Sequence, residues 1–198
     1  MTMRGKAKVP GDAELKRLFA VTKVGVNAKR NIAILGASYR LGLRAKEMAA
    51  LTVGDVLDDD GAIREECLLS AAQTKGGKPR VVYLTHPAVR SALKDYLAER
   101  EQAQGLAFMR GSPLFRSTKG GGFSPNTMQQ LLHKIHEQAG IIGGRSHSGR
   151  RWFATELIGK GADLKAVSVL MGHSSVAMTA RYAEDNPQRL RRLVMEML

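Results

Sequence analysis

The chain is poor in cysteine, in long apolar runs and in acidic side chains. Cys67 is its single cysteine, so no intrachain disulfide can form and a CxxC-type zinc site is excluded. No stretch approaches the roughly 20 consecutive apolar residues that cross a bilayer. The basic residues within positions 1–8 are not followed by the apolar core of a signal peptide. We therefore expect a cytoplasmic protein that does not span a membrane.

Acidic residues are outnumbered by basic ones. The chain has 18 Asp and Glu against 31 Lys and Arg, which gives a net charge of +13. A charge of this size attracts polyanions and speeds their capture. The basic residues are spread through segments that look folded: Lys16, Arg17, Lys29, Arg30, Arg40, Arg44, Lys75, Lys78, Arg80, Arg145, Arg150, Arg151 and Arg181. This distribution favours a DNA-binding face over a disordered basic arm or a basic surface without specific purpose.

Hydrophobic periodicity predicts a mostly helical domain. Apolar spacing and capping residues predict helices over residues 13–19, 28–41, 44–51, 87–103, 125–139, 147–158 and 164–171, in the segment that carries Tyr182, and from Pro187 onward. The predicted caps are Asp12, Thr85, Ser124, Ser146, Asp163 and either Ser174 or Ser175. Residues 66–69 and 80–84 flank a turn at 74–79 and predict two strands. The predicted class is α+β, mostly helical, with a small antiparallel sheet at its edge.

The length of 198 residues fits one domain, and 43% hydrophobic residues suffice for a packed core. We expect residues 1–10 to form a loose N-terminal leader and residues 11–198 to form the folded domain.

A small group of side chains is suited to attack on a phosphodiester without a metal. Such a reaction needs fixed positive donors for the nonbridging oxygens, an in-line nucleophile and a proton for the leaving oxygen. Arg44 and Arg150 lie at or near predicted helix starts, and a guanidinium donates two hydrogen bonds to one phosphate. His147 precedes Arg150 by three residues, and Tyr182 follows His173 by nine.

Each of these residues has a simpler interpretation when taken alone. A single histidine is more often a core or surface residue, and a single tyrosine more often packs. Lys75 lies on a flexible turn, where lysine is common. His133 and His136 lack a carboxylate pattern that would indicate a metal site. Residues 119–122 lack the GK[ST] ending of a phosphate-binding loop, and we predict no cofactor.

Two acidic residues near Arg44 could also be read as a catalytic pair. We instead expect Glu47 to orient basic neighbours and Asp55 to brace the turn that follows the first arginine helix.

Four segments, taken together, resemble the motif boxes of the tyrosine recombinases, the phage-integrase family. Residues 42–56, beginning Gly42, Leu43 and Arg44, look like the first arginine box. Residues 74–84 are similar to the family's lysine hairpin, and residues 147–155 resemble its HxxR box. Residues 170–182 resemble its last box, with the same nine-residue interval between histidine and tyrosine. One box alone would be weak evidence for the family, but four boxes in the family's order are a specific signal.

The resemblance implies a catalytic set and a role for each member. Tyr182 would attack the scissile phosphate and leave a 3′-phosphotyrosyl link and a free 5′-hydroxyl. Arg44 and Arg150 would hold the nonbridging oxygens. Lys75 would protonate the leaving 5′-oxygen. The remaining members are His147, which would assist proton transfer at the tyrosine, and His173, which would hold the phosphate and the pocket.

The resemblance also implies a fold, a substrate and an assembly. Residues 11–198 would adopt the family's catalytic-domain fold and act on double-stranded DNA as a site-specific recombinase or integrase, without metal or ATP. The partners implied are further copies of the chain, in a tetramer on DNA, and accessory DNA-bending proteins. A non-catalytic DNA-binding regulator on the same fold and a type IB topoisomerase are the alternatives.

The two ends of the chain carry open expectations. About forty residues precede Arg44, whereas most family members carry a separate N-terminal DNA-clamp domain. The chain is therefore either a catalytic fragment or a compact single-domain member. The tail beyond Pro187 has an apolar stripe, which either packs on its own domain or docks on a neighbouring protomer: Leu190, Leu193, Val194 and Met197.

The segment that resembles the HxxR box, residues 147–155, departs from the family pattern at three positions: Gly149, Arg151 and Trp152. Glycine inside a helix costs about 0.5–1 kcal/mol relative to alanine, so we expect Gly149 to loosen its helix.

Overall fold

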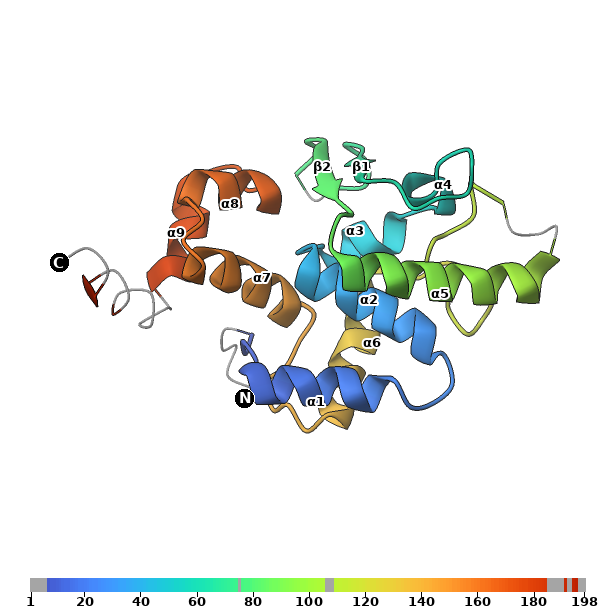
Figure 1. Cartoon of the computed structure of the whole chain (residues 1–198), viewed down its shortest axis with the longest axis horizontal. Helices are drawn as coiled ribbons and strands as arrows, with labels where there is room; N and C mark the ends of the chain where they lie inside the picture. The colour runs from blue at the N-terminus through green and yellow to red at the C-terminus, as the bar shows by residue number, and fades with distance from the viewer. Residues whose placement is uncertain (1–6, 75, 106–108, 185–190, 192–193, 196–198) are drawn as a thin grey trace.

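The computed structural model describes residues 7–74, 76–105, 109–184, 191, 194 and 195 (Figure 1). In chain order the elements are α1 (Asp12–Thr22), α2 (Ala28–Arg40), α3 (Ala45–Ala50), α4 (Val53–Val56), β1 (Glu66–Leu69), β2 (Arg80–Tyr83), α5 (Pro87–Gln104), α6 (Pro125–Gln138), α7 (Ser148–Gly159), α8 (Leu164–Met171) and α9 (Val176–Glu184). The mostly helical α+β class predicted from sequence is confirmed. Within the described ranges no helix is both long and apolar enough to cross a membrane.

The sheet is a two-stranded antiparallel pair at the edge of the helical body (Figure 1). In its register Glu66 pairs with Tyr83 and Leu69 pairs with Arg80. Cys67 and Leu69 are buried, whereas Glu66 and Leu68 are exposed, as expected for a strand with one face on the core. The predicted hairpin is confirmed, and its second strand ends one residue earlier than expected.

Helix starts were predicted with mixed success. The Ser124 hydroxyl accepts from the backbone of α6, and the Asp163 carboxylate accepts from the backbone of α8, as predicted. Asp12 is not the cap of α1 but its first helical residue. Gly11 holds the cap position because the Glu14 carboxylate accepts its backbone N–H at 3.2 Å.

Two further predicted caps are displaced by one residue. His86, and not Thr85, precedes α5, because Pro87 occupies the first helical position, where its fixed φ suits a helix start. His147, and not Ser146, precedes α7. The hydroxyl of Ser148 instead accepts the backbone N–H of Arg145 at 2.9 Å.

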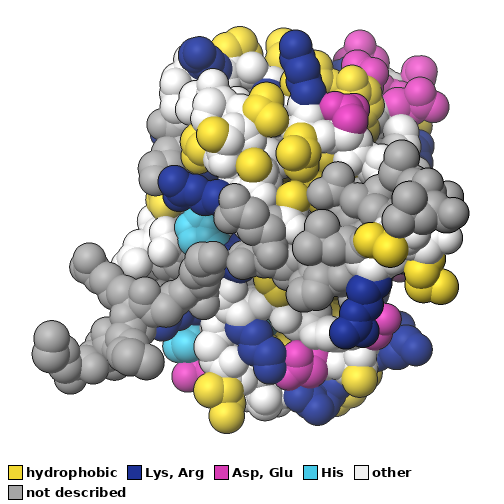
Figure 2. All heavy atoms as spheres, turned by 90° about the vertical axis from the view of Figure 1, so that its left-hand side faces the viewer, with side chains coloured by type: hydrophobic (Ala, Val, Ile, Leu, Met, Phe, Trp, Pro, Cys, Tyr) yellow, Lys and Arg dark blue, Asp and Glu magenta, His cyan; other side chains and the backbone are white. Residues whose placement is uncertain are grey.

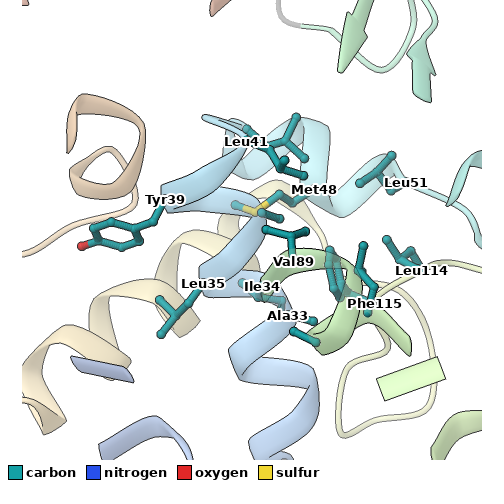
Figure 3. Close-up of a cluster of buried hydrophobic side chains, with 14 of the residues drawn as sticks. Ala33, Ile34, Leu35, Tyr39, Leu41, Met48, Leu51, Val89, Leu114 and Phe115 are labelled. Carbon is teal, nitrogen blue, oxygen red and sulfur yellow. The ribbon is translucent and has the colours of Figure 1, made fainter. Parts of the chain in front are cut away.

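The main core surrounds α2, which packs against α5 and α7. Residues 33–39 of α2 are buried without interruption, so this helix is covered on all sides over two turns. Figure 3 shows its side chains among those of the surrounding segments: Ala33, Ile34, Leu35, Tyr39, Leu41, Met48, Leu51, Val89, Leu114 and Phe115.

A second, smaller core joins α7, α8 and α9. Its fully buried members are Ala154, Ile158, Val167 and Met171, and the ring of Tyr182 packs against them. Trp152, on the preceding turn of α7, belongs to the main core. Helix α7 therefore connects the two cores, and the α8–α9 unit lies to one side of the body (Figure 1).

Gly149 lies where α7 crosses α2. A Cβ at this position would overlap the Ser38 hydroxyl and lie 2.8 Å from Cδ2 of Tyr39. The expectation that this glycine loosens α7 misses its main effect, which is to let the two helices approach closely.

The N-terminal end differs from the sequence-based expectation where it is described. Residues 7–10 are not loose: Lys8 N–H donates to Gly143 O at 3.1 Å, Val9 packs on the core and Pro10 is buried. The helix predicted from Pro187 lies largely outside the described residues. Of its members, Arg191, Val194 and Met195 are described, and all three are helical and exposed.

Candidate active site

Arg44 is held at the start of α3 by Glu47. The Glu47 carboxylate accepts the Arg44 backbone N–H at 2.8 Å and its Nη1 at 2.7 Å. Glu47 is fully buried, whereas the Arg44 side chain keeps 16% exposure. The carboxylate therefore fixes the guanidinium from the protein side while the guanidinium still reaches the surface. This confirms the interpretation of Glu47 as a residue that orients basic neighbours.

Asp55 performs the structural task predicted for it. Its Oδ2 accepts from the Thr52 backbone N–H at 2.8 Å and from Gln73 Nε2 at 2.9 Å. The first contact caps α4, and the second ties the turn after α3 to the segment that follows β1.

Arg150 is almost fully buried, at 3% exposure. Its Nη1 donates to Gly42 O at 2.6 Å, and its Nη2 donates to Met171 O. Burial lowers the pKa of Arg150 to about 9, and the positive charge of Arg44 acts in the same direction. This pKa still leaves the guanidinium charged at neutral pH.

Arg80, which opens β2, is a third guanidinium at the site. Its Nη2 donates to Glu47 Oε2 at 2.8 Å, and its Nη1 donates to Leu170 O at 2.7 Å. The side chain is 7% exposed. Arg80 is absent from the predicted catalytic set; from the sequence it counts only as a strand residue of the hairpin and as one of the dispersed basic residues. The signal available in the sequence was its spacing: Arg80 and Val82 lie two residues apart in a predicted strand and therefore share one face, and Val82 is buried.

The three arginines converge on the C-terminal end of α8. The carbonyl groups of residues 170–172 accept, in chain order, from Arg80, Arg150 and Arg44, the last at 3.4 Å. The last carbonyls of a helix have no partner within it and carry its partial negative charge. Guanidiniums from three different motif boxes supply those partners and hold the segment that leads to His173.

His173 and Tyr182 lie side by side. Their ring centroids are 6.0 Å apart and the ring planes differ by 13°. His173 Nδ1 is 2.8 Å from the hydroxyl of Thr179, which is fully buried. When that hydroxyl donates to Nδ1, the proton of the neutral ring sits on Nε2, which is then a donor. Thr179 was not singled out from the sequence, because a threonine inside a helix carries no signal of its own.

The ring of His173 is held neutral. Burial lowers the pKa of His173 to about 4, and the charges of Arg150, Arg44 and Arg80 add to the shift. Arg151 brings a positive charge close to the phenol ring of Tyr182. Its Cζ lies 5.9 Å from the ring centroid, within the range of a cation–π contact.

The two remaining members of the predicted set are placed less fully. His147 is exposed and directly precedes α7, one turn from Arg150. Lys75 lies outside the described residues. Its neighbour Thr74 is buried, and Thr74 O accepts from Lys46 Nζ at 2.9 Å. The hairpin is thus attached to α3 immediately before position 75.

Charged side chains of both signs lie on the face that carries α7, α8 and α9. Figure 2 shows Lys and Arg side chains scattered over this face, with histidine and Asp or Glu side chains among them. Within the described ranges, no group of three or more His, Cys, Asp or Glu side chains is placed to hold a metal ion. The side chains that bring positive charge to the end of α8 are the guanidiniums of Arg44, Arg80 and Arg150.

The arrangement brings a phenol, a neutral imidazole and three guanidiniums to one end of α8. Guanidiniums in a desolvated setting stabilise charge on phosphate oxygens, and a phenol can act as a nucleophile. Together they are suited to phosphoryl transfer to a tyrosine.

Comparison with known sequences is consistent with this chemistry. The family model described as "Phage integrase family" matches residues 11–189. The tyrosine recombinase XerC of Brucella suis biovar 1 (strain 1330) is 36% identical over 164 residues, covering 82% of this chain and 49% of the relative. The tyrosine recombinase XerD of Mycobacterium leprae (strain TN) is 38% identical over 166 residues, covering 82% and 50%. The chain spans about half the length of these curated relatives.

Comparison with solved structures gives the same fold. The crystal structure of the XerA recombinase superposes with a TM-score of 0.78 at 25% identity, covering 98% of this chain and 66% of that one. The XerH site-specific recombinase, in a post-cleavage complex with its palindromic difH substrate, gives a TM-score of 0.73 at 25% identity. That match covers 96% of this chain and 53% of XerH.

Proposed function

Because the chain belongs to the phage integrase family, we propose that it cuts and rejoins DNA strands as the catalytic domain of a site-specific recombinase or integrase. The observation that carries the proposal is the position of Tyr182, stacked on His173 at the end of a segment held by Arg44, Arg80 and Arg150. A DNA-binding protein that does not cut has no use for a nucleophile placed there.

In the proposed first step, the phenol oxygen of Tyr182 attacks the scissile phosphorus. A P–O bond to the tyrosine forms as the P–O bond to the 5′-oxygen breaks, which leaves a 3′-phosphotyrosyl link. His147 assists removal of the phenol proton, and Lys75 gives a proton to the leaving 5′-oxygen. In the second step a 5′-hydroxyl from a partner strand attacks the link and releases the tyrosine. The number of phosphodiester bonds is conserved, so no ATP is consumed.

The arginines and His173 stabilise charge in this step. Arg150 uses one N–H on each terminal nitrogen for a backbone carbonyl, which leaves further N–H groups for the nonbridging oxygens. Arg44 is the more exposed of the pair and is tied to Gly172 by a long contact of 3.4 Å. Its Nη2 can therefore shift to a phosphate oxygen at little cost while Glu47 holds Nη1. A neutral His173 with its proton on Nε2 adds another donor.

The proposed substrate is double-stranded DNA, and the proposed assembly is a tetramer of this chain on DNA. A net charge of +13 supports capture of DNA. Of the structural relatives, XerH is bound to its difH substrate, and a lambda integrase dimer is bound to a core site. Accessory DNA-bending proteins are part of the same proposal.

A covalent trapping experiment tests the proposed function. Duplexes that tile the DNA flanking the gene, each nicked so that cleavage is irreversible, are incubated with the protein and run on a denaturing gel. The wild type should give a slower protein–DNA band, and Tyr182→Phe should lose that band while still retarding the same duplex on a native gel. Adducts that persist in Tyr182→Phe would show that another residue is the nucleophile.

The same assay separates the alternatives. A regulator would retard DNA but form no adduct on any duplex. A type IB topoisomerase would relax supercoiled plasmid without joining two DNA partners. Adduct formation should survive EDTA, because guanidiniums supply the positive charge that a metal nuclease takes from its ions. Activity that EDTA removes and Mg²⁺ restores would contradict the proposed mechanism.

A further inference from the structure

Arg80 connects three of the motif segments without belonging to the predicted catalytic set. It opens β2 within the hairpin segment, pairs with Glu47 inside the first arginine box, and donates to Leu170 O at the end of α8. Its two terminal nitrogens are thus committed to two different elements, at 2.8 and 2.7 Å.

We propose that Arg80 is a positioning residue that fixes the C-terminal end of α8, and with it His173 and Tyr182, against the arginine-bearing body. The effect of Arg80 on catalysis rests on the proposed function, whereas its effect on the position of α8 does not. Among the described residues, two other arginines donate to the end of α8: Arg150 to Met171 O, and Arg44 to Gly172 O over a long 3.4 Å.

The packing around Gly172 supports a tight fit. A Cβ at Gly172 would lie 2.5 Å from Cδ of Arg80, so the aliphatic part of the arginine rests directly on this backbone. Gly172 has a φ of 58°, ends α8 and immediately precedes His173. The arginine side chain therefore covers the turn from which the histidine departs.

The bridge requires the shape of arginine and not only its charge. A planar guanidinium presents donors in two directions. A lysine ammonium is a compact point charge, and the lysine side chain is shorter than that of arginine. Lysine at position 80 could pair with Glu47, but it would not span to Leu170 O at the same time. Arg80→Lys therefore removes the bridge and keeps the charge.

Hydrogen–deuterium exchange tests the positioning role without any DNA. Arg80→Lys should raise amide exchange in residues 164–184 by about tenfold and leave residues 28–40 unchanged. The matched control is Arg90→Lys. Arg90 also donates to backbone carbonyls, Ile63 O at 2.8 Å, Arg64 O at 2.9 Å and Leu84 O at 3.3 Å, but it lies outside the site. The control should leave residues 164–184 as in the wild type.

A second readout connects the contact to chemistry. On a duplex that the wild type cleaves, Arg80→Lys should slow single-turnover adduct formation by about 100-fold, because small misplacements of reacting groups are costly. Its Kd for the same duplex should stay within about twofold, since the charge is retained. Arg90→Lys should keep the wild-type rate.

The outcomes are separable. An exchange rate in residues 164–184 of Arg80→Lys equal to that of the wild type would overturn the positioning role. Faster exchange throughout the chain would also overturn it, because it would indicate a general loss of stability. A wild-type cleavage rate in this variant would also overturn it. If the wild type itself forms no adduct, the proposed function fails, and the exchange experiment still decides whether Arg80 fixes α8.

Discussion

Gly149 of α7 lies directly against Ser38 of α2, with no room for a side chain between them. A Cβ at position 149 would overlap the Ser38 hydroxyl and lie 3.0 Å from its carbonyl carbon. The next residue is Arg150. The close crossing of α7 and α2 therefore determines where the buried guanidinium starts, and from there it reaches Gly42 O and Met171 O.

Gly149→Ala should therefore destabilise the protein and slow cleavage. In an open helix the change would stabilise by about 0.5–1 kcal/mol, but overlap in a packed interior costs about 1–3 kcal/mol. The second effect is larger, so we expect a lower free energy of unfolding, measured by urea denaturation. Gly121→Ala is the matched control, because a Cβ there meets nothing within 4 Å.

A second substitution checks the cause. Ser38→Ala in the Gly149→Ala background should recover part of the lost stability, because it removes the oxygen that the new methyl group meets. Gly149→Ala that is as stable as the wild type would show that α7 can move away from α2 at little cost.

Glu47→Gln should be strongly destabilising. The carboxylate accepts from Arg44 and Arg80 and is fully buried, so neutralising it leaves two guanidiniums without their counter-charge. Breaking a buried pair in this way costs about 3–5 kcal/mol. The control is Glu99→Gln, which removes a half-exposed pair with Lys29 worth at most about 1 kcal/mol. Equal thermal stability of the two variants would contradict the buried network.

The stabilising effect of Glu47 should depend on pH in a defined direction. Burial raises the pKa of Glu47, but the hydrogen bond and charge of Arg80 and the contacts with Arg44 outweigh it, and the net shift is downward. The contribution is therefore complete above the ordinary glutamate pKa and is lost as the pH falls through the lowered value. The wild type should lose stability over that acidic range, and Glu47→Gln should lose less.

The sequence predicts the elements better than it predicts their contacts. The hairpin at 66–69 and 80–83, the proline start of α6 and the Asp163 cap follow from local rules of strand alternation, turn residues and capping. The proposed catalytic set was predicted from motif boxes and their spacing, and not from periodicity. What local rules could not give are contacts between segments far apart in the chain, such as Arg80 with Leu170 and Gly149 with Ser38.

The reason is physical. A buried arginine and a surface arginine are the same residue in the sequence. Their burial and pairing differ only in the folded chain, where a partner such as Glu47 lies beside the buried one. Gly149 illustrates the same limit, because its low helix propensity is a local property and the close approach of α2 is not.

His173 should stay neutral through most of the acidic range. Because its pKa is lowered to about 4, chiefly by burial, the folded ring takes up a proton only near that pH. The unfolded chain takes up its proton near pH 6.5, so stability should fall as the pH drops from about 6.5 to 4 and should not change on this account above 6.5. Histidine Cε1–H resonances, assigned with His173→Gln, give the titration directly. A midpoint near 6.5 would contradict the half-buried, cation-flanked position.

Removal of residues 187–198 should leave the fold intact and weaken assembly on DNA. Val194 and Met195 are 61% and 83% exposed, so these apolar side chains are not covered by the described part of their own domain. Docking of this segment on a neighbouring protomer would bury them, in line with the tetramer proposed on DNA. The truncated protein should keep its circular dichroism spectrum and melting temperature, whereas sedimentation with duplex DNA should show smaller complexes than the full chain forms. The Tyr182→Phe full chain is the control, because it should assemble without cutting. A truncation that lowers the melting temperature and loses helical signal would show that the segment packs on its own core.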